Sequence, residues 1–364
     1  MPPETYRKLI VVCWILICGL LSGCQSIHYM GQAISGHLDL LNRREPVADL
    51  IEDPQTPEKL KKQLLLTTEL LAFAEKELSL PAGEQYRSYV QLDRPYVVWN
   101  VFAAPELSLE PRTWCYPVAG CTVYRGFFSE KNAGQYAQKL AGRGYDVIVG
   151  GVTAYSTLGW FNDPLLSTFI DRSESGLAML IFHELAHQVL YVPDDSSFNE
   201  SFATAVAQVG LRRWYIARDN PDQFRRYTEF YADKQKMLLI IADFRGRLRD
   251  LYQSSLSENT KRRQKIALFS EMRQEFESHL KQKKSLAVFS DWFAPPLNNA
   301  RLVSIATYHD HVPAFQQLLK NNQNDLDRFY QQCRRLAEYN PAKRRNALQE
   351  LVNTSSPNAA AMDL

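Results

Sequence analysis

The sequence of 364 residues has almost no net charge and no long hydrophobic run. Its 42 lysine and arginine residues nearly balance 40 acidic residues, and the formal charge of +2 gives no electrostatic reason to expect a nucleic-acid partner. The apolar run from Leu9 to Leu21 is shorter than the roughly 20 residues that a membrane-spanning helix needs. Because 45% of the residues are hydrophobic, the chain can still form one large or two modest globular domains.

The N-terminal segment has the order of an export signal. Arg7 and Lys8 precede the apolar run, and the small residues of Leu21-Ser22-Gly23-Cys24 follow it. This ending resembles a bacterial lipobox, whose cysteine becomes the acylated first residue of a lipoprotein. The resemblance implies that residues 1–23 are a lipoprotein signal peptide and that Cys24 carries lipid. Gln25 then implies an outer-membrane lipoprotein of the cell envelope that faces the periplasm. An uncleaved N-terminal anchor is the alternative.

Cysteine is scarce, with six residues in the chain, and two of these lie inside the expected signal peptide. Cys115 and Cys121 flank the segment YPVAG, whose proline and glycine favour a turn. In an oxidising compartment this spacing predicts a local disulfide. The alternative is half of a metal site, but zinc sites of this kind use a second cysteine pair.

The pattern of the chain changes along its length. Leucines at helical spacing predict a helix after Pro57, whereas Val, Tyr, Phe and Trp broken by Pro and Gly predict strands in the middle third. Beyond Pro221 the pattern is helical and includes a long antiparallel hairpin. We therefore expect a signal peptide over 1–23, a helical segment over 24–90, a catalytic core over 91–218, a helical region over 219–350 and a flexible tail over 351–364.

Histidine is also scarce, yet two of the seven histidines stand four residues apart. His183 and His187 lie on one face of an expected helix, so both rings can bind one metal ion. Glu184 lies beside His183 around the helix, where it can take a proton from an activated water without binding the metal. Apolar neighbours surround these groups, and burying them without a partner would be costly. The alternative is a chance match whose histidines bond to backbone groups.

Two expected helices frame this motif. Asp171 with Glu174 forms a capping box for a helix that runs to about Val192. Ser197 with Glu200 forms a second capping box, for a helix that runs to about Ala217.

Glu200 is the expected third metal ligand. A short connection between antiparallel helices brings the first turn of the second helix toward the first helix, and Thr204 can orient the carboxylate of Glu200 through its hydroxyl. Glu200 could instead only cap its own helix, in which case Asp194 or Asp195 would be the third ligand.

The segments HELAHQ and FNESFAT together resemble the gluzincin pattern, in which HExxH is completed by the glutamate of an NExxA segment. The match holds at His183, Glu184, His187, Asn199, Glu200 and Ala203. WCYPVAGCTVYRGFF, AYSTLGWFNDPLLST and LVSIATYHDHVPAF extend the likeness to a family of bacterial lipoproteins described as aminopeptidases. The resemblance implies one Zn²⁺ per chain, a hydrolytic reaction, and a supporting place for Asn199 beside Glu200. The helix connection is shorter than in gluzincin aminopeptidases, and their amine-capturing GxMEN segment is absent.

Two further segments are candidates for handling a substrate. Residues 154–159, which include Ala154, Tyr155, Ser156 and Thr157, precede the metal helix and could pair with a peptide backbone, or could be an ordinary core strand. Tyr308 is the expected stabiliser of a developing oxyanion, with His309, His311 and Tyr155 as alternatives. His309 and His311 could also form a second zinc site.

The sequence thus predicts an α+β fold with a zincin-like metallopeptidase core, a long helical hairpin and a helical C-terminal half. The expected function is a zinc-dependent aminopeptidase acting on a peptide or protein substrate, tethered to the membrane through lipidated Cys24. Two alternatives remain. One is an endopeptidase of the envelope, and the other is a non-catalytic scaffold with structural zinc.

Overall fold

The computed structural model describes residues 31–32, 35–116, 120–154, 162–294, 296–305 and 311–353. The expected signal peptide and lipid site lie outside this range. So do Tyr155, Ser156, Thr157, Tyr308 and His309. Among the described helices, none is long and apolar enough to cross a membrane.

The N-terminal part is a helical layer with a small sheet. Residues 35–42 are helical, and β1 (Glu45–Pro46), α2 (Val47–Glu52), α3 (Glu58–Leu78) and β2 (Ser88–Val90) follow. The apolar face of α3 is buried because its leucines recur at helical spacing, and the helix ends where Ser79 takes a left-handed backbone with φ 51°. β2 pairs antiparallel with β1 and parallel with β8 (Leu165–Leu166), which lies just before the histidine helix.

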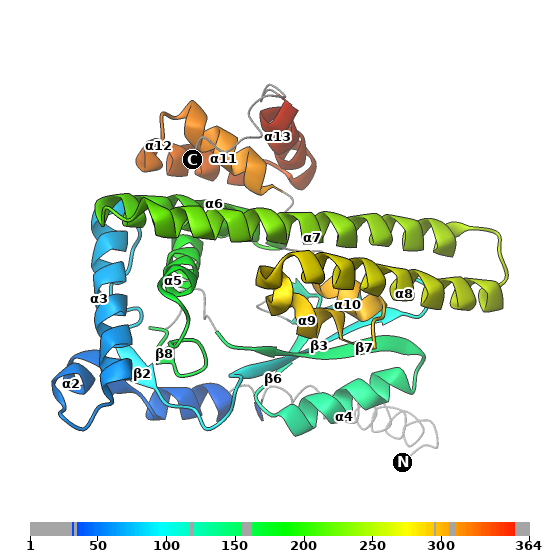
Figure 1. Cartoon of the computed structure of the whole chain (residues 1–364), viewed down its shortest axis with the longest axis horizontal. Helices are drawn as coiled ribbons and strands as arrows, with labels where there is room; N and C mark the ends of the chain where they lie inside the picture. Colours follow the sequence, from blue (N-terminus) through cyan, green and yellow to red (C-terminus); the bar gives the residue numbers. More distant parts are fainter. Residues whose placement is uncertain are drawn as a thin grey trace, which may run out of the picture.

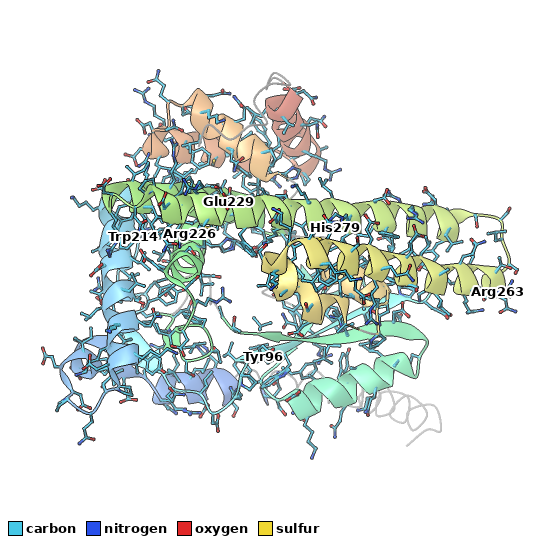
Figure 2. The ribbon with its side chains drawn as sticks, viewed as in Figure 1. Tyr96, Trp214, Arg226, Glu229, Arg263 and His279 are labelled. Atoms are coloured by element: carbon cyan, nitrogen blue, oxygen red, sulfur yellow. A yellow bond between two sulfur atoms is a disulfide. The ribbon has the colours of Figure 1, made fainter. Side chains whose placement is uncertain are left out.

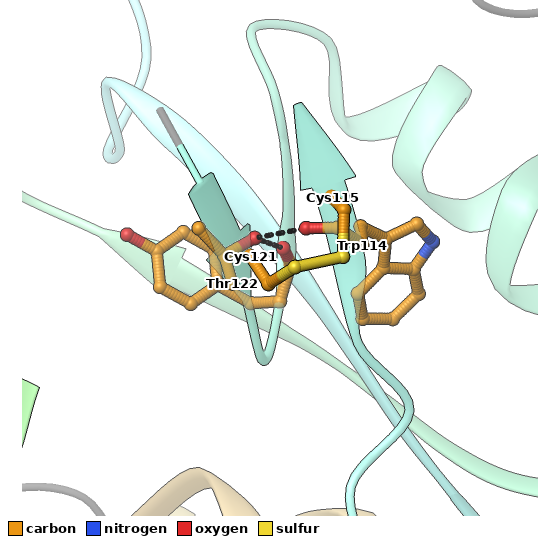
Figure 3. The surroundings of a disulfide bond; sticks show 5 residues. Trp114, Cys115, Cys121 and Thr122 are labelled. Atoms are coloured by element: carbon orange, nitrogen blue, oxygen red, sulfur yellow. Dashed lines mark hydrogen bonds between the residues drawn. A yellow bond between two sulfur atoms is a disulfide. The ribbon is translucent and has the colours of Figure 1, made fainter. Parts of the chain in front are cut away.

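An antiparallel sheet fills the middle of the chain. The central strand β3 (Val98–Pro105) pairs along its full length with β7 (Tyr145–Val152), and on its other side with β6 (Arg125–Phe127). α4 (Glu130–Ala141) covers one face of this sheet (Figure 1). A small hairpin of β4 (Trp114–Tyr116) and β5 (Gly120–Thr122) carries the disulfide between Cys115 and Cys121 (Figure 3).

The largest hydrophobic core surrounds a pair of packed helices, α5 (Glu174–Val189) and α6 (Ser196–Ala217). Trp214 of α6 packs edge-on against Phe73 of α3, with ring centroids 5.1 Å apart (Figure 2). The three C-terminal helices α11 (Val312–Asn321), α12 (Leu326–Ala337) and α13 (Pro341–Asn353) join the same core. This core therefore draws on the expected N-terminal, catalytic and C-terminal segments together.

The long helical hairpin has a core of its own. It consists of α7 (Pro221–Gln253) and α8 (Glu258–Gln282), followed by η1 (Lys284–Phe289), α9 (Ser290–Phe293) and α10 (Asn299–Ile305). Buried Lys265 of α8 donates to Asp146 of β7 at 2.6 Å, and the backbone N–H of Asn299 donates to the same carboxylate at 2.8 Å. These bonds attach the hairpin to the sheet, so that α7 runs over the region between α5 and the sheet (Figure 1).

Gly210 is the position at which α6 approaches its neighbours most closely. A Cβ there would lie 2.7 Å from side-chain atoms of Leu78 and of Phe182, and both of these side chains are fully buried. The three helices α3, α5 and α6 can meet only because this position has no side chain.

We expect Gly210→Ala to lower the free energy of unfolding by about 1–3 kcal/mol, because overpacking a buried contact forces its neighbours to move. Gly246→Ala in α7 is the matched control, since its nearest contact is a flexible arginine atom at 3.9 Å. Removing a helical glycine there should be neutral or stabilising by up to about 1 kcal/mol. Urea unfolding measures both, and equal effects at the two positions would contradict the packing account.

Candidate metal centre

The helix that carries the two histidines begins later than its sequence suggests. Ser173 is the N-cap of α5, and its hydroxyl accepts from the backbone N–H of Gly176 at 3.3 Å. The prediction of a cap at Asp171 is wrong, because Asp171 pairs with Lys59 at 2.7 Å. The helix also ends at Val189 instead of about Val192, since the chain turns there toward α6.

The turn between α5 and α6 is closed by the side chain of Asn199. Its Oδ1 accepts from the backbone N–H of Val192, and its Nδ2 donates to the carbonyl of Val192, both at 2.8 Å. Asn199 is buried, so these bonds satisfy the polar groups of the turn away from water. Asn199 thus supports the site by shaping the turn, and its side chain is hydrogen-bonded to Val192, not to Glu200.

Asp195 is the N-cap of α6. Its Oδ1 accepts from the N–H of Phe198 at 3.1 Å, and its Oδ2 accepts from buried Arg344 of α13 at 2.8 Å. The predicted cap at Ser197 is therefore wrong, because Asp195 lies at the position where the helix starts. Both oxygens of Asp195 are bonded in the turn, and Asp194 has the left-handed backbone of a turn residue with φ 62°.

The turn brings Glu200 to the two histidines. Nε2 of His183 lies 3.2 Å from Oε2 of Glu200 and 3.2 Å from Nε2 of His187. Nε2 of His187 lies 3.8 Å from Oε1 of Glu200. Among the described histidine, cysteine and acidic residues, these three form the one group whose ligand atoms converge within 4.8 Å.

These separations fit a metal ion. Ligands about 2.0–2.1 Å from a tetrahedral zinc lie about 3.3 Å from one another, close to the two distances of 3.2 Å. Two ring nitrogens that face each other can share only one proton, so a cation between them satisfies both lone pairs. Two imidazoles and one carboxylate form a donor set that zinc takes in hydrolases. The residues present therefore fit zinc.

The surroundings of the two histidines shift their pKa values in opposite directions. Burial lowers the pKa of His183. The hydrogen bond to Glu200 and the charges of Glu184 and Glu200 raise this pKa by a larger amount, so the net change is upward. Burial, with the charge of His183 adding to it, lowers the pKa of His187 to about 4. His187 is thus neutral at physiological pH and presents a lone pair, as a metal ligand must.

Glu184 lies outside the converging group and has its own neighbours. Burial raises the pKa of Tyr86 well above its usual value, and the charge of Glu184 raises it further. Burial lowers the pKa of Arg172, an effect that the charge of Glu184 opposes. The carboxylate of Glu184, on the ligand helix itself, therefore lies within electrostatic range of a buried phenol and a cation.

Lys234 and Tyr191 also border the site. The positive charge of Lys234 on α7 lowers the pKa of His183, which places this lysine near the metal ligands, and burial lowers its own pKa. The ring of Tyr191 lies 6.4 Å from that of His187. Tyr86, Arg172 and Lys234 were not predicted from the sequence, because they belong to no local motif and are brought in by tertiary packing.

The other predicted residues lie around the group. Thr204 is buried but makes no hydrogen bond to Glu200 in the described part of the chain. Ala154 packs against the main core beyond the end of β7, and Arg172 donates to the hydroxyl of neighbouring Thr153 at 2.8 Å. The backbone N–H of His311 donates to Ser201 at 3.1 Å, which ties the segment after Tyr308 to α6.

The site is thus a place where two imidazoles and one carboxylate converge beside a second carboxylate. The chain belongs to the family described as "Putative aminopeptidase", whose model matches residues 28–348. A search of curated proteins finds no match. A search of solved structures finds none either. Membership of this family indicates a peptidase, and hence a peptide substrate.

We expect Glu200→Gln to weaken zinc binding by at least tenfold, because removing a ligand should cost no less than the roughly 10–100-fold typical of losing a group that only orients one. Asp194→Asn is the matched control, since Asp194 is exposed and asparagine also adopts its left-handed backbone, so zinc content should be unchanged. Metal analysis and competition with a chelator measure both proteins. Equal zinc affinity in wild type and Glu200→Gln would rule out Glu200 as the third ligand.

Proposed function

We propose that the protein is a zinc-dependent aminopeptidase of the bacterial cell envelope. The convergence of His183, His187 and Glu200, with Glu184 one position away on the helix, carries the proposal. The peptidase family supports it. The export signal and the lipobox-like segment ending at Cys24 support the envelope location and an outer-membrane anchor.

Each residue near the site has a chemical task in this proposal. His183, His187 and Glu200 hold the ion, which when bound supplies a Lewis acid and lowers the pKa of a water molecule. Glu184 takes the proton of the attacking water and returns it to the leaving amine. Arg172 and Tyr86 flank Glu184 and hold its carboxylate in a polar position within an otherwise apolar wall. Segment 154–159 receives the peptide backbone, because Arg172 anchors its start beside α5.

Lys234 of α7 supplies a positive charge in this proposal. Its charge acts on His183, and among the described residues it forms no ion pair with an acidic residue. A cation in a dry site stabilises negative charge that develops on a peptide oxygen more strongly than it would in water. Lys234 and Tyr308 are the two candidates for this task, and they come from different segments.

An endopeptidase is the second candidate function. The amine-capturing segment of related aminopeptidases is absent from the sequence, and a site without it has no evident reason to require a free amino terminus. The chemistry at Glu184 is the same in both cases. The two functions differ only in which peptides are accepted.

We expect Glu184→Gln to retain zinc and to lose about 10²–10⁴-fold in kcat, because the amide cannot accept the proton. Glu229→Gln is the matched control on the exposed face of α7 (labelled in Figure 2) and should be fully active. Release of amino acids from peptides with free and acetylated amino termini measures turnover. Cleavage of acetylated peptides would show that the protein is an endopeptidase and not an aminopeptidase. Full activity of Glu184→Gln would rule out Glu184 as the general base, and the absence of turnover by the wild type would favour a scaffold with structural zinc.

We expect Lys234→Met to lower kcat by about tenfold or more with zinc content unchanged, since loss of one charge-stabilising group typically costs about 10²–10³-fold when it touches the reacting oxygen. Lys236→Met is the control, because Lys236 is exposed on the same helix and lies 3.9 Å from Asp233. Steady-state kinetics on one peptide compares the two. Equal activity of both variants would remove Lys234 from the mechanism.

A further inference from the structure

A second cavity lies along α6, away from the metal centre. It has a volume of about 130 Å³ and is enclosed by α6, α7 and α11. Gln208, which lines it, is eight residues beyond Glu200, or about 12 Å along the helix at 1.5 Å per residue. The cavity is therefore separate from the metal ligands.

One wall of this cavity is aromatic. Phe224, Tyr227 and Tyr231 project from successive turns of α7, with neighbouring ring centroids 6.4 and 6.0 Å apart and interplanar angles of 27° and 24°. Ile216, a largely exposed aliphatic residue, also lines the cavity. An apolar cavity of about 150 Å³ accepts benzene. The space therefore suits one aryl or branched alkyl group.

A buried amide also faces this space. Gln208 is 6% exposed, and its Oε1 accepts from Nε2 of Gln316 at 2.7 Å. Among the described residues, no acceptor meets the geometry of a hydrogen bond to its own Nε2, although the hydroxyls of Tyr227 and Tyr231 lie close to the amide. Burial raises the pKa of both hydroxyls, and the amide of Gln208 lowers it by a smaller amount. A buried donor without an acceptor is unfavourable, so a ligand oxygen that accepts from this amide is favoured.

The charges around the cavity have one sign. Arg212 and Lys320 line it, and no aspartate or glutamate does. In the part of the chain that the structure describes, neither of these two cations forms an ion pair, whereas Arg213 is bonded to the carbonyls of Glu77 and Asn324. An anionic head group complements this rim, and an ammonium group does not.

We propose that this cavity binds a small monocarboxylic acid that carries one aryl or branched alkyl group and no ammonium group. The apolar group lies against Phe224 and Tyr227, and the carboxylate meets Arg212 and the amide of Gln208. The same chemistry occurs in a free acid and in the C-terminal residue of a peptide. The proposal does not depend on the catalytic function, because the cavity and the metal centre share no residue.

The test is calorimetric titration of the purified full-length protein with 3-phenylpropionate, N-acetylphenylalanine, 2-phenylethanol and 2-phenylethylamine. We expect the acid to bind at least about tenfold more tightly than the alcohol, in line with a charge-assisted hydrogen bond, and the amine not to bind. Binding of N-acetylphenylalanine equal to or above that of 3-phenylpropionate identifies a peptide end as the source, and weaker binding identifies a free acid. Equal binding of acid and amine, or no binding of the acid, overturns the proposal.

Repeating the titration with a chelator separates this cavity from the metal centre, because a carboxylate can also bind zinc. The heat of binding should persist without zinc, and its disappearance would place the acid at the metal and overturn the proposal. Arg212→Gln and Gln208→Leu should each weaken binding by about tenfold. Arg226→Gln is the control on the exposed face of α7 and should bind as wild type does (Figure 2). Unchanged affinity in folded Arg212→Gln, verified by its melting curve, contradicts the proposed site.

Discussion

The candidate metal centre depends on the pair of hydrogen bonds between the side chain of Asn199 and the backbone of Val192. These bonds close a turn of six residues between α5 and α6. Closing the turn sets the direction in which α6 leaves it. Glu200 directly follows Asn199 in the chain. The carboxylate therefore meets His183 because an amide one position earlier fixes the backbone. Packing of α6 on α5 and α3, possible at Gly210 only without a side chain, holds this arrangement in place.

Much of the site could be predicted from the sequence because it depends on residues that lie close together along the chain. The spacing of His183 and His187 is a property of any helix, and a short connection necessarily returns the next helix toward the first. The caps were mispredicted because Asp171, Ser173, Asp195 and Ser197 are all good capping residues. Asp195 is also held by Arg344, 149 residues away, and no local pattern contains that contact. Lys234 and Tyr86 escaped prediction for the same reason. The expectations for Tyr308 and the substrate segment remain predictions.

The molecule places different tasks on different parts of one helix. The first turn of α6 provides Glu200, its middle is buried in the main core, and its last turns line the second cavity. The converging ligand group and the cavity share no residue. Helix α7 contributes residues to both places. Its Lys234 acts on the candidate metal centre through its charge, and its aromatic residues line the cavity.

Arg344 joins the turn of the candidate site to the last described helix. This buried arginine of α13 bonds to Asp195 in that turn and to the carbonyls of Ala337 and Tyr339, at and just beyond the end of α12. The residue that fastens the turn therefore comes more than a hundred positions after Glu200 in the chain. A chain cut before α13 would carry His183, His187 and Glu200 without the complete fastening of their turn.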